Sequence, residues 1–117
     1  MTVKECYALI GGDYDDVMTR LRTDERIKKF LGKVADDKSI ELLEQSLKER
    51  NMEEAFRAAH TLKGVGLNLS LTALYTSAET MTEALRGRTE YGDDLIPLYE
   101  DLRKVFDNCA VNIRNID

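Results

Sequence analysis

Hydrophobic residues recur every three or four positions along most of the chain, and no stretch alternates between hydrophobic and polar residues. The first spacing is typical of helices that bury one face, whereas alternation would indicate strands. The pattern therefore predicts seven helices and no strand. Their approximate ranges are 3–10, 14–21, 24–34, 37 or 38 to 49, 52–68, 71–86 and 95–114.

Residues that commonly cap helices precede several of these segments. They are Asp13, Thr23, Asp36 or Asp37, and Asp94. Such short polar side chains accept hydrogen bonds from the free N–H groups of a first helical turn. A cap at Asp94 also places Pro97 in the first turn, where a missing N–H costs little. Glycines are expected to end helices at Gly11-Gly12 and at Gly87, because glycine adopts the left-handed conformation found there.

Each longer helix carries one hydrophobic face, which predicts how the helices pack. The residues expected to face the core are Ile27, Phe30, Leu31, Val34, Ile40, Leu43, Leu47, Met52, Ala55, Ala59, Leu62, Gly66, Leu69, Leu71, Leu74, Tyr75, Ala78, Met81, Leu85, Leu95, Leu98, Leu102, Val105, Cys109 and Ile113. Four substantial helices with short connections predict an all-α fold, an antiparallel four-helix bundle with short additional N-terminal helices. We expect a single domain over residues 1–117, with a helical lead-in at 1–22 and the bundle at 23–115.

Composition narrows the classes of function. The chain has 33% charged and 43% hydrophobic residues and one proline, as is typical of a folded domain. Its net charge of −5 disfavours nucleic acid as a partner, because binding to the phosphate backbone needs a basic surface. The chain has no run of about 18 apolar residues, so no membrane-spanning helix is predicted. Its first residues lack the apolar segment of a secretory signal. We expect a cytoplasmic protein that does not associate with a membrane.

The two cysteines, Cys6 and Cys109, indicate packing rather than chemistry. Thiols stay reduced in the cytoplasm, and cysteine often packs as a small hydrophobic side chain. Both are therefore expected in or near the core. No Cys-x-x-Cys pair and no cluster of cysteine and histidine indicates a metal site. The chain is expected to bind no metal and no cofactor of its own.

His60 is the only histidine of the chain and lies in the stretch RAAHTLKGVGLNLS, residues 57–70. A helix turns about 100° per residue. On this geometry Ala59, Leu62 and Gly66 lie within roughly 30° of the centre of the hydrophobic face, and His60 lies about 130° from it. The imidazole is therefore predicted to point to solvent or to the rim of the bundle.

The neighbours of His60 on the helical wheel form an unusual group. They are Phe56, Lys63, Gly64 and Leu67. A glycine inside a helix costs about 1 kcal/mol relative to alanine, so each one needs a reason. Gly66 lies on the buried face, where the missing side chain lets another helix approach. Gly64 lies on the outer side and is predicted to clear space beside the imidazole, while Lys63 places an ammonium group near anything attached to the ring.

The run AHTLKGVGLNL, residues 59–69, closely resembles the motif of the histidine phosphotransfer (HPt) domain family, His-x-Leu-Lys-Gly followed by a short apolar stretch. The resemblance extends loosely over residues 23–115, and Glu79 follows in the next helix. It implies a bundle whose histidine accepts a phosphoryl group from a receiver-domain aspartate and passes it to another receiver. Two places depart from the commonest pattern: Val65-Gly66 after the Lys-Gly pair, and Ser70, where glycine is usual.

The resemblance implies that His60 is phosphorylated, through Nε2. Nucleophilic attack requires the neutral form of the imidazole. Phosphoryl transfer depends mainly on positioning and electrostatics. Lys63 is therefore expected to stabilise the phosphoryl oxygens, and Gly64 to give them room. Such a protein is a phosphoryl carrier with no ATP site and no turnover of its own.

The partners implied by the resemblance are receiver domains of response regulators or hybrid sensor kinases. Phe56 and Leu67 would supply apolar docking surface beside the histidine, and Arg57 would meet an acidic receiver pocket. The alternatives are that Phe56 and Leu67 are residues at the rim of the core and that Arg57 belongs to an ordinary solvated face. Mg²⁺ is expected on the partner receiver domain, because no cluster of carboxylates is predicted around His60.

Three other functions are compatible with a small helical bundle. One is an interaction module that binds receiver domains without being phosphorylated, although the presence of His60 with its lysine and glycine argues against it. A second is an enzyme with His60 as general base, which needs an orienting acid and a substrate pocket that the sequence does not indicate. A third is a dimerising bundle built on the near-heptad spacing of the last helix. Burial within one chain explains that spacing, and a monomer is expected.

Overall fold

The computed structural model describes residues 1–117 and contains seven helices and no strand. The helices are α1 Val3–Ile10, α2 Tyr14–Leu21, α3 Asp24–Ala35, α4 Ser39–Lys48, α5 Met52–Asn68, α6 Thr72–Leu85 and α7 Leu95–Arg114. All seven predicted helices are present, with ends close to the predicted ranges. None of them is both long enough and apolar enough to cross a membrane.

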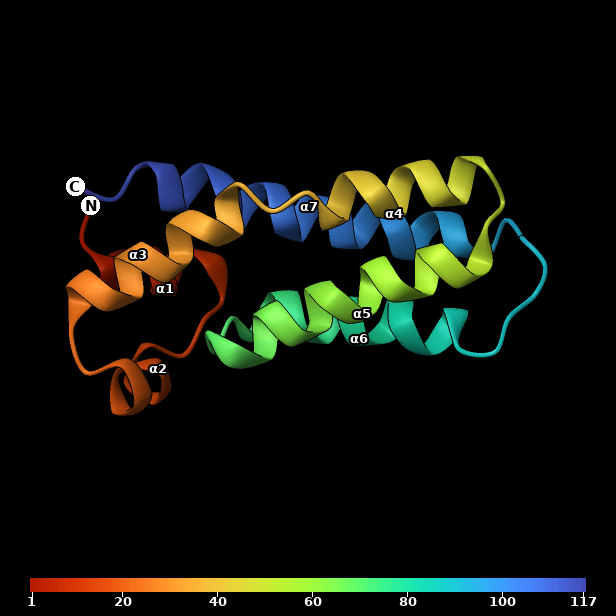
Figure 1. Ribbon diagram of the computed structural model, residues 1–117. Coiled ribbons are helices and arrows are strands. Elements are labelled where there is room, and N and C mark those ends of the chain that lie inside the picture. Colours follow the sequence, from red (N-terminus) through yellow and green to blue (C-terminus); the bar gives the residue numbers. More distant parts are fainter.

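The helices form an antiparallel bundle, as predicted (Figure 1). α5 packs against α4 on one side and α6 on the other, and α6 packs against α7. α3 and α4 follow each other along α7, so that together they make the fourth member of the bundle (Figure 1). The short helices α1 and α2 lie at the end of the bundle where α7 finishes, and the two chain termini meet there (Figure 1).

Local sequence explains most of the helix ends. The side chain of Asp13 accepts a hydrogen bond from the backbone N–H of Asp16, and Thr23 accepts one from Arg26, so both predicted caps are confirmed. Gly11 ends α1 with a φ of 68°, in the left-handed region that glycine adopts without strain.

Two other predicted caps differ from the structure. The cap of α4 is Lys38, so the prediction of Asp36 or Asp37 was wrong. The Asp37 carboxylate instead accepts a hydrogen bond, at 2.6 Å, from the backbone N–H of Ser39 only two residues ahead. Asp94 does precede the first residue of α7, but its carboxylate accepts two hydrogen bonds from the Arg88 guanidinium instead of capping the backbone.

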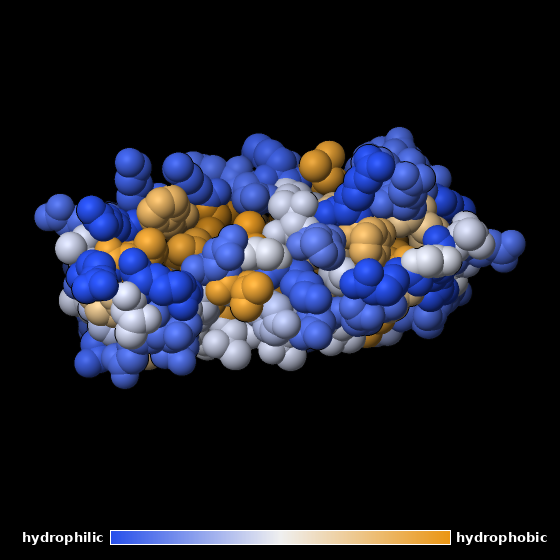
Figure 2. Space-filling model, turned by 60° about the horizontal axis from the view of Figure 1, so that its bottom comes forward, coloured by the Kyte–Doolittle hydropathy of each residue, from blue (hydrophilic) through white to orange (hydrophobic).

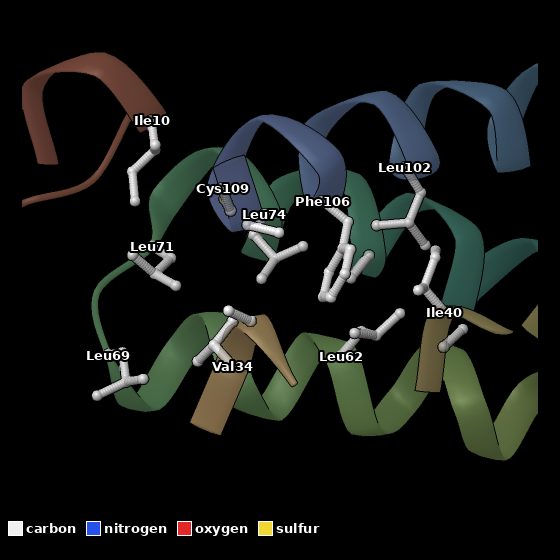
Figure 3. Close-up of a cluster of buried hydrophobic side chains, with 14 of the residues drawn as sticks. Ile10, Val34, Ile40, Leu62, Leu69, Leu71, Leu74, Leu102, Phe106 and Cys109 are labelled. Carbon is white, nitrogen blue, oxygen red and sulfur yellow. The ribbon is translucent and has the colours of Figure 1, made fainter. Parts of the chain in front are cut away.

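A single cluster of buried hydrophobic side chains runs through the bundle. Figure 3 shows part of it, with side chains from α5, α6 and α7 meeting those of α1, α3 and α4. The predicted buried face of α5 is confirmed in full: Met52, Ala55, Ala59, Leu62, Gly66 and Leu69 are all buried. The side of α5 that carries His60 is therefore left facing outward.

Some side chains predicted to face the core do not. Phe30 is 39% exposed and Tyr75 is half-buried, so both inward assignments were wrong. Leu47, Leu98 and Val105 do pack against the core, as predicted, but are only half-buried. On α7, Phe106 and Ala110 are buried instead. The heptad spacing used for α7 drifts from the 3.6-residue turn of a straight helix, so the buried face moves by one position along its length.

Cys6 and Cys109 are buried free thiols, as predicted from the sequence. Burial raises the pKa of both, and that of Cys109 reaches about 12. Because the thiolate is the reactive form, these side chains contribute packing rather than chemistry.

Candidate functional site

His60 lies on the outward face of α5, about the middle of the helix. Its neighbours Ala59 and Leu62 are buried, whereas the imidazole is exposed. The prediction that this ring points to solvent is confirmed. An exposed ring nitrogen in this place is accessible to a second protein.

Two glycines near His60 have different surroundings. A Cβ atom added at Gly66 would lie 2.7 Å from the backbone nitrogen of Tyr75, so the missing side chain allows α5 and α6 to approach closely. A Cβ atom added at Gly64 would have no atom within 4 Å. Packing therefore requires Gly66, but it does not explain Gly64. Gly64 leaves open space on the same side of the helix as the imidazole.

The imidazole contacts one aromatic ring. The ring centroids of Phe56 and His60 lie 5.7 Å apart, with the planes tilted by 31°. Phe56 is half-buried and packs against the core. From the residue that follows α6, the guanidinium of Arg86 lies over the Phe56 ring at 5.2 Å from its centroid.

Lys63 lies on the side of α5 that faces α6. It is half-buried, and its Nζ lies over the Tyr75 ring at 6.0 Å from the centroid. A hydrogen bond to Glu79 is the main cause of a raised pKa at the Tyr75 hydroxyl. Nearby, a hydrogen bond from Arg86 holds the pKa of Glu83 below its usual range, and the charge of Lys63 adds to that effect. The ammonium group of Lys63 forms no ion pair of 4 Å or less, so it is free to meet another anion.

The other two predicted docking residues have different surroundings. Leu67 is 60% exposed on the same side of α5 as His60. Arg57 forms ion pairs with two carboxylates of its own helix, with Glu53 at 3.1 Å and with Glu54 at 3.0 Å. A partner that binds Arg57 would have to compete with both of them.

An apolar hollow of about 300 Å³ lies where the end of α5 meets α3 and α2. Its lining residues are Leu21, Phe30, Lys33, Val34, Asp37, Val65, Asn68 and Leu69. Val65 is five residues beyond His60, which is roughly 7 to 8 Å along the helix axis. Figure 2 shows the largest hydrophobic area in the left half of this view and smaller hydrophobic patches, separated by polar atoms, elsewhere on the face. Around the helix Val65 lies about 140° from His60, so the hollow opens on another side of α5 than the imidazole, near the C-terminal end of the same helix.

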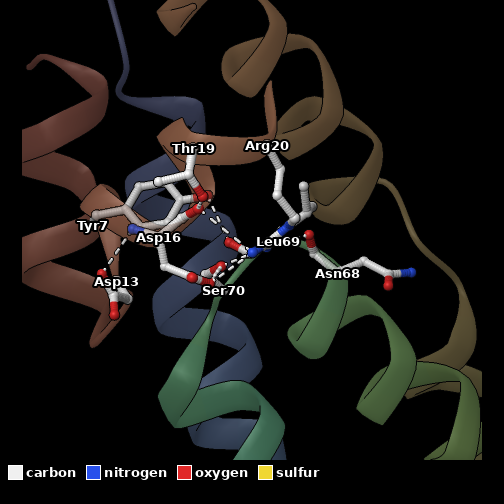
Figure 4. Close-up of polar contacts among 8 residues, drawn as sticks. All are labelled: Tyr7, Asp13, Asp16, Thr19, Arg20, Asn68, Leu69 and Ser70. Atoms are coloured by element: carbon white, nitrogen blue, oxygen red, sulfur yellow. Dashed lines mark hydrogen bonds and ion pairs between the residues drawn. The ribbon is translucent and has the colours of Figure 1, made fainter. Parts of the chain in front are cut away.

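The turn that ends α5 is held by side chains of α2 (Figure 4). Ser70 has a φ of 55°, in the left-handed region that glycine usually occupies. Its hydroxyl donates a hydrogen bond to the carboxylate of Asp16 and accepts one from Arg20 at 2.6 Å. Arg20 also donates to the carbonyl oxygen of Asn68 at 2.9 Å. These bonds compensate for the conformation that Ser70 adopts in place of glycine.

The first helix adds a further contact to the same turn (Figure 4). The buried Tyr7 hydroxyl donates a hydrogen bond to the carbonyl oxygen of Leu69 at 2.8 Å, and burial is the main cause of the raised pKa of that hydroxyl. The backbone N–H of Asp13 donates to the carbonyl oxygen of Ser70, also at 2.8 Å. Residues of the lead-in therefore fix the end of the helix that carries His60.

Three neighbours of the site were not identified from sequence. Tyr75 and Arg86 lie opposite Lys63 and Phe56, but the α6 pattern assigned Tyr75 to the core. Phe30 was likewise assigned to the core and lines the hollow instead. The available signal was the clustering of Tyr75, Glu79, Glu83 and Arg86 at helical spacing along one side of α6. No group of three or more cysteine, histidine or acidic side chains is arranged to hold a metal ion.

A comparison with protein families finds one match. The family model described as Hpt domain matches residues 27–112 of the 117 residues. That range includes α4, α5 and α6 entirely and leaves α1 and α2 outside. No curated protein and no solved structure matches the chain.

Proposed function

The chain belongs to the Hpt domain family, whose members carry out histidine phosphotransfer in phosphorelays, and on that premise we propose that His60 is the residue that carries the phosphoryl group. The observation that supports this most directly is the exposed imidazole beside the open space at Gly64. His60 is also the only histidine of the chain.

In the proposed reaction a ring nitrogen of His60 attacks the phosphorus atom of an aspartyl phosphate on a receiver domain. A P–N bond forms while the P–O bond to the aspartate breaks, and its electron pair returns to the carboxylate. The second ring nitrogen keeps its proton. The reverse sequence on another receiver discharges the histidine. By family resemblance the attacking atom is Nε2.

Lys63 would stabilise the charge on the phosphoryl oxygens as they approach the ring. Its long, flexible side chain lies over Tyr75 in the structure, and it would turn from that ring toward His60 when the phosphoryl group arrives. Gly64 would leave room for the phosphoryl oxygens. Mg²⁺ would be supplied by the partner receiver domain.

Receiver domains of response regulators or hybrid sensor kinases are the proposed partners. Leu67 lies on the same side of α5 as His60, and the apolar hollow that includes Phe30 and Val65 lies further around the C-terminal end of the helix. Both would receive apolar side chains of the receiver. Arg57, already paired with two carboxylates, would contribute less to docking than Leu67.

A phosphotransfer assay tests this proposal. A receiver domain is loaded with radiolabelled phosphate and mixed with the protein and Mg²⁺, and the label is followed onto the protein beside a His60→Gln variant. The proposal expects acid-labile, base-stable label on the wild type alone. If several receivers transfer no label while one of them still binds, the chain is an interaction module that is not phosphorylated.

A further inference from the structure

We infer that Phe56 is a positioning residue for His60: its ring, packed on the core and covered by Arg86, holds the imidazole in one orientation. This inference rests on the proposed function of His60. It assigns Phe56 a different role from the docking role expected from the sequence.

The first observation is that neither ring nitrogen of His60 has a hydrogen-bond partner. Most histidines with a fixed orientation owe it to a hydrogen bond from one nitrogen, which also selects the tautomer. Here the side chains nearest along α5 are Phe56, Lys63 and the empty position at Gly64. Lys63 lies over Tyr75, and Arg57, one turn before His60, is held by its ion pairs with Glu53 and Glu54. Phe56 is therefore the side chain whose ring contacts the imidazole.

The second observation is that Phe56 is itself fixed on two sides. One side packs against the hydrophobic core. On the other, the Arg86 guanidinium lies over the ring at 5.2 Å, and Glu83 accepts a hydrogen bond from Arg86 Nη2 at 3.0 Å. A half-buried ring with these neighbours has little freedom to change rotamer.

The geometry of the contact suits the chemistry. A centroid separation of 5.7 Å lies within the range of favourable aromatic pairs. A tilt of 31° places the two ring planes closer to parallel than to perpendicular, and no hydrogen bond occupies either imidazole nitrogen. Orienting a nucleophile before the reaction removes an entropic cost from the transfer step. Phe56 therefore orients the imidazole without occupying the atom that reacts.

Two variants separate the effect of the aromatic face of Phe56 from the effect of its apolar volume. Phe56→Leu keeps an apolar side chain on the core but removes the aromatic face, and Phe56→Tyr keeps the face. Tyr91→Leu is the matched control, because Tyr91 is another half-exposed ring beneath an arginine, Arg50, at 4.2 Å.

NMR of the unphosphorylated protein tests the contact without any partner. Coupling constants and imidazole proton shifts of His60 report its side-chain rotamer and the ring current of Phe56. We expect the wild type and Phe56→Tyr to show one dominant rotamer and Phe56→Leu to show averaging, with no change in Tyr91→Leu. Unchanged rotamer populations in Phe56→Leu would overturn the inference, whatever the outcome of the transfer assay.

Transfer kinetics then separate positioning from docking. As the receiver concentration is varied, Phe56→Leu should lower the maximal rate constant roughly three- to tenfold, the range that an aromatic contact contributes. The half-saturating receiver concentration should stay unchanged, and Phe56→Tyr should restore the rate. A raised half-saturating concentration with an unchanged maximal rate would instead make Phe56 a docking residue. Absence of transfer in the wild type would overturn the proposed function, while the NMR result would still decide the contact.

Discussion

Gly64 and Gly66 lie two residues apart on α5 and have opposite surroundings: an added Cβ atom at Gly66 would lie 2.7 Å from the backbone of Tyr75, and at Gly64 it would meet nothing within 4 Å. Gly64 leaves open space beside His60, and Gly66 allows the close contact between α5 and α6. Because both differ from alanine by one methyl group, their effects on stability and transfer can be compared directly.

Gly66→Ala should destabilise the protein. Alanine improves helix propensity by about 1 kcal/mol, but forcing a methyl group against backbone atoms costs about 1–3 kcal/mol. Because the α6 backbone cannot turn away as a side chain can, we expect the upper part of that range and a net loss in the free energy of unfolding. Urea denaturation measures it, and an increase in stability would show that the two helices separate easily.

Gly64→Ala should have the opposite effect on stability and should impair transfer. With open space around the new methyl group, the free energy of unfolding should rise by roughly 0.5–1 kcal/mol. The same methyl group narrows the space for phosphoryl oxygens beside His60, so the rate of phosphotransfer should fall. Gly32→Ala is the control, because Gly32 is another helical glycine with nothing within 4 Å and lies on α3. It should gain similar stability and transfer at the wild-type rate.

Replacement of Ser70 should show how its hydrogen bonds offset its left-handed conformation. Ser70→Ala keeps the Cβ atom and loses the bonds to Asp16 and Arg20, so we expect a loss of about 1–2 kcal/mol in unfolding free energy. Ser70→Gly loses the same bonds but relieves the backbone, and it should be the more stable of the two variants. Equal stability of the two in thermal or urea denaturation would contradict this account.

The same contact predicts a dependence on pH. Hydrogen bonds from Ser70 and then Arg20 hold the pKa of Asp16 below its ordinary value of 3.8. A carboxylate whose pKa is lower in the folded state stabilises the protein above the ordinary value, and this stabilisation is lost as the pH falls through the folded-state value. The difference in denaturation midpoint between the wild type and Asp16→Asn should therefore be largest near pH 7 and shrink toward pH 2. A difference independent of pH would show that the charge of Asp16 does not contribute.

Phe30→Ser tests the apolar hollow as docking surface. Phe30 is 39% exposed, so its loss should lower the free energy of unfolding by about 1–2 kcal/mol, while the half-saturating receiver concentration should rise several-fold. Val111→Ser, which removes a 57% exposed apolar side chain from α7, is the control and should not affect transfer. If both variants behave alike, receivers bind to another surface.

The outward position of His60 was predictable because it follows from helical periodicity along α5 alone. The residues of α5 that are buried in the bundle lie on one face of the helix. The surroundings contributed by other elements were not predictable in the same way. Phe30 and Tyr75 fit helical spacing as core residues, and only the relative placement of α2, α3 and α6 leaves them partly exposed.

The contact between Ser70 and Asp16 joins residues 54 positions apart, and no local pattern indicates it. The sequence shows Ser70 in place of the usual glycine, but the side chains that compensate for its left-handed conformation, Asp16 and Arg20, belong to α2. Helical spacing does place Phe56 and Arg86 on their own helices, yet their contact depends on how closely α5 and α6 approach. That approach is set by Gly66.

The most direct measurement is ³¹P NMR of ¹⁵N-histidine-labelled protein after incubation with a phosphorylated receiver domain and Mg²⁺. With one histidine in the chain, we expect one phosphorus signal that is split by coupling to a ring nitrogen of His60. Once the receiver and inorganic phosphate have been removed, a phosphorus signal on this protein without that coupling would place the phosphoryl group on a hydroxyl or carboxyl group and contradict the assignment of His60.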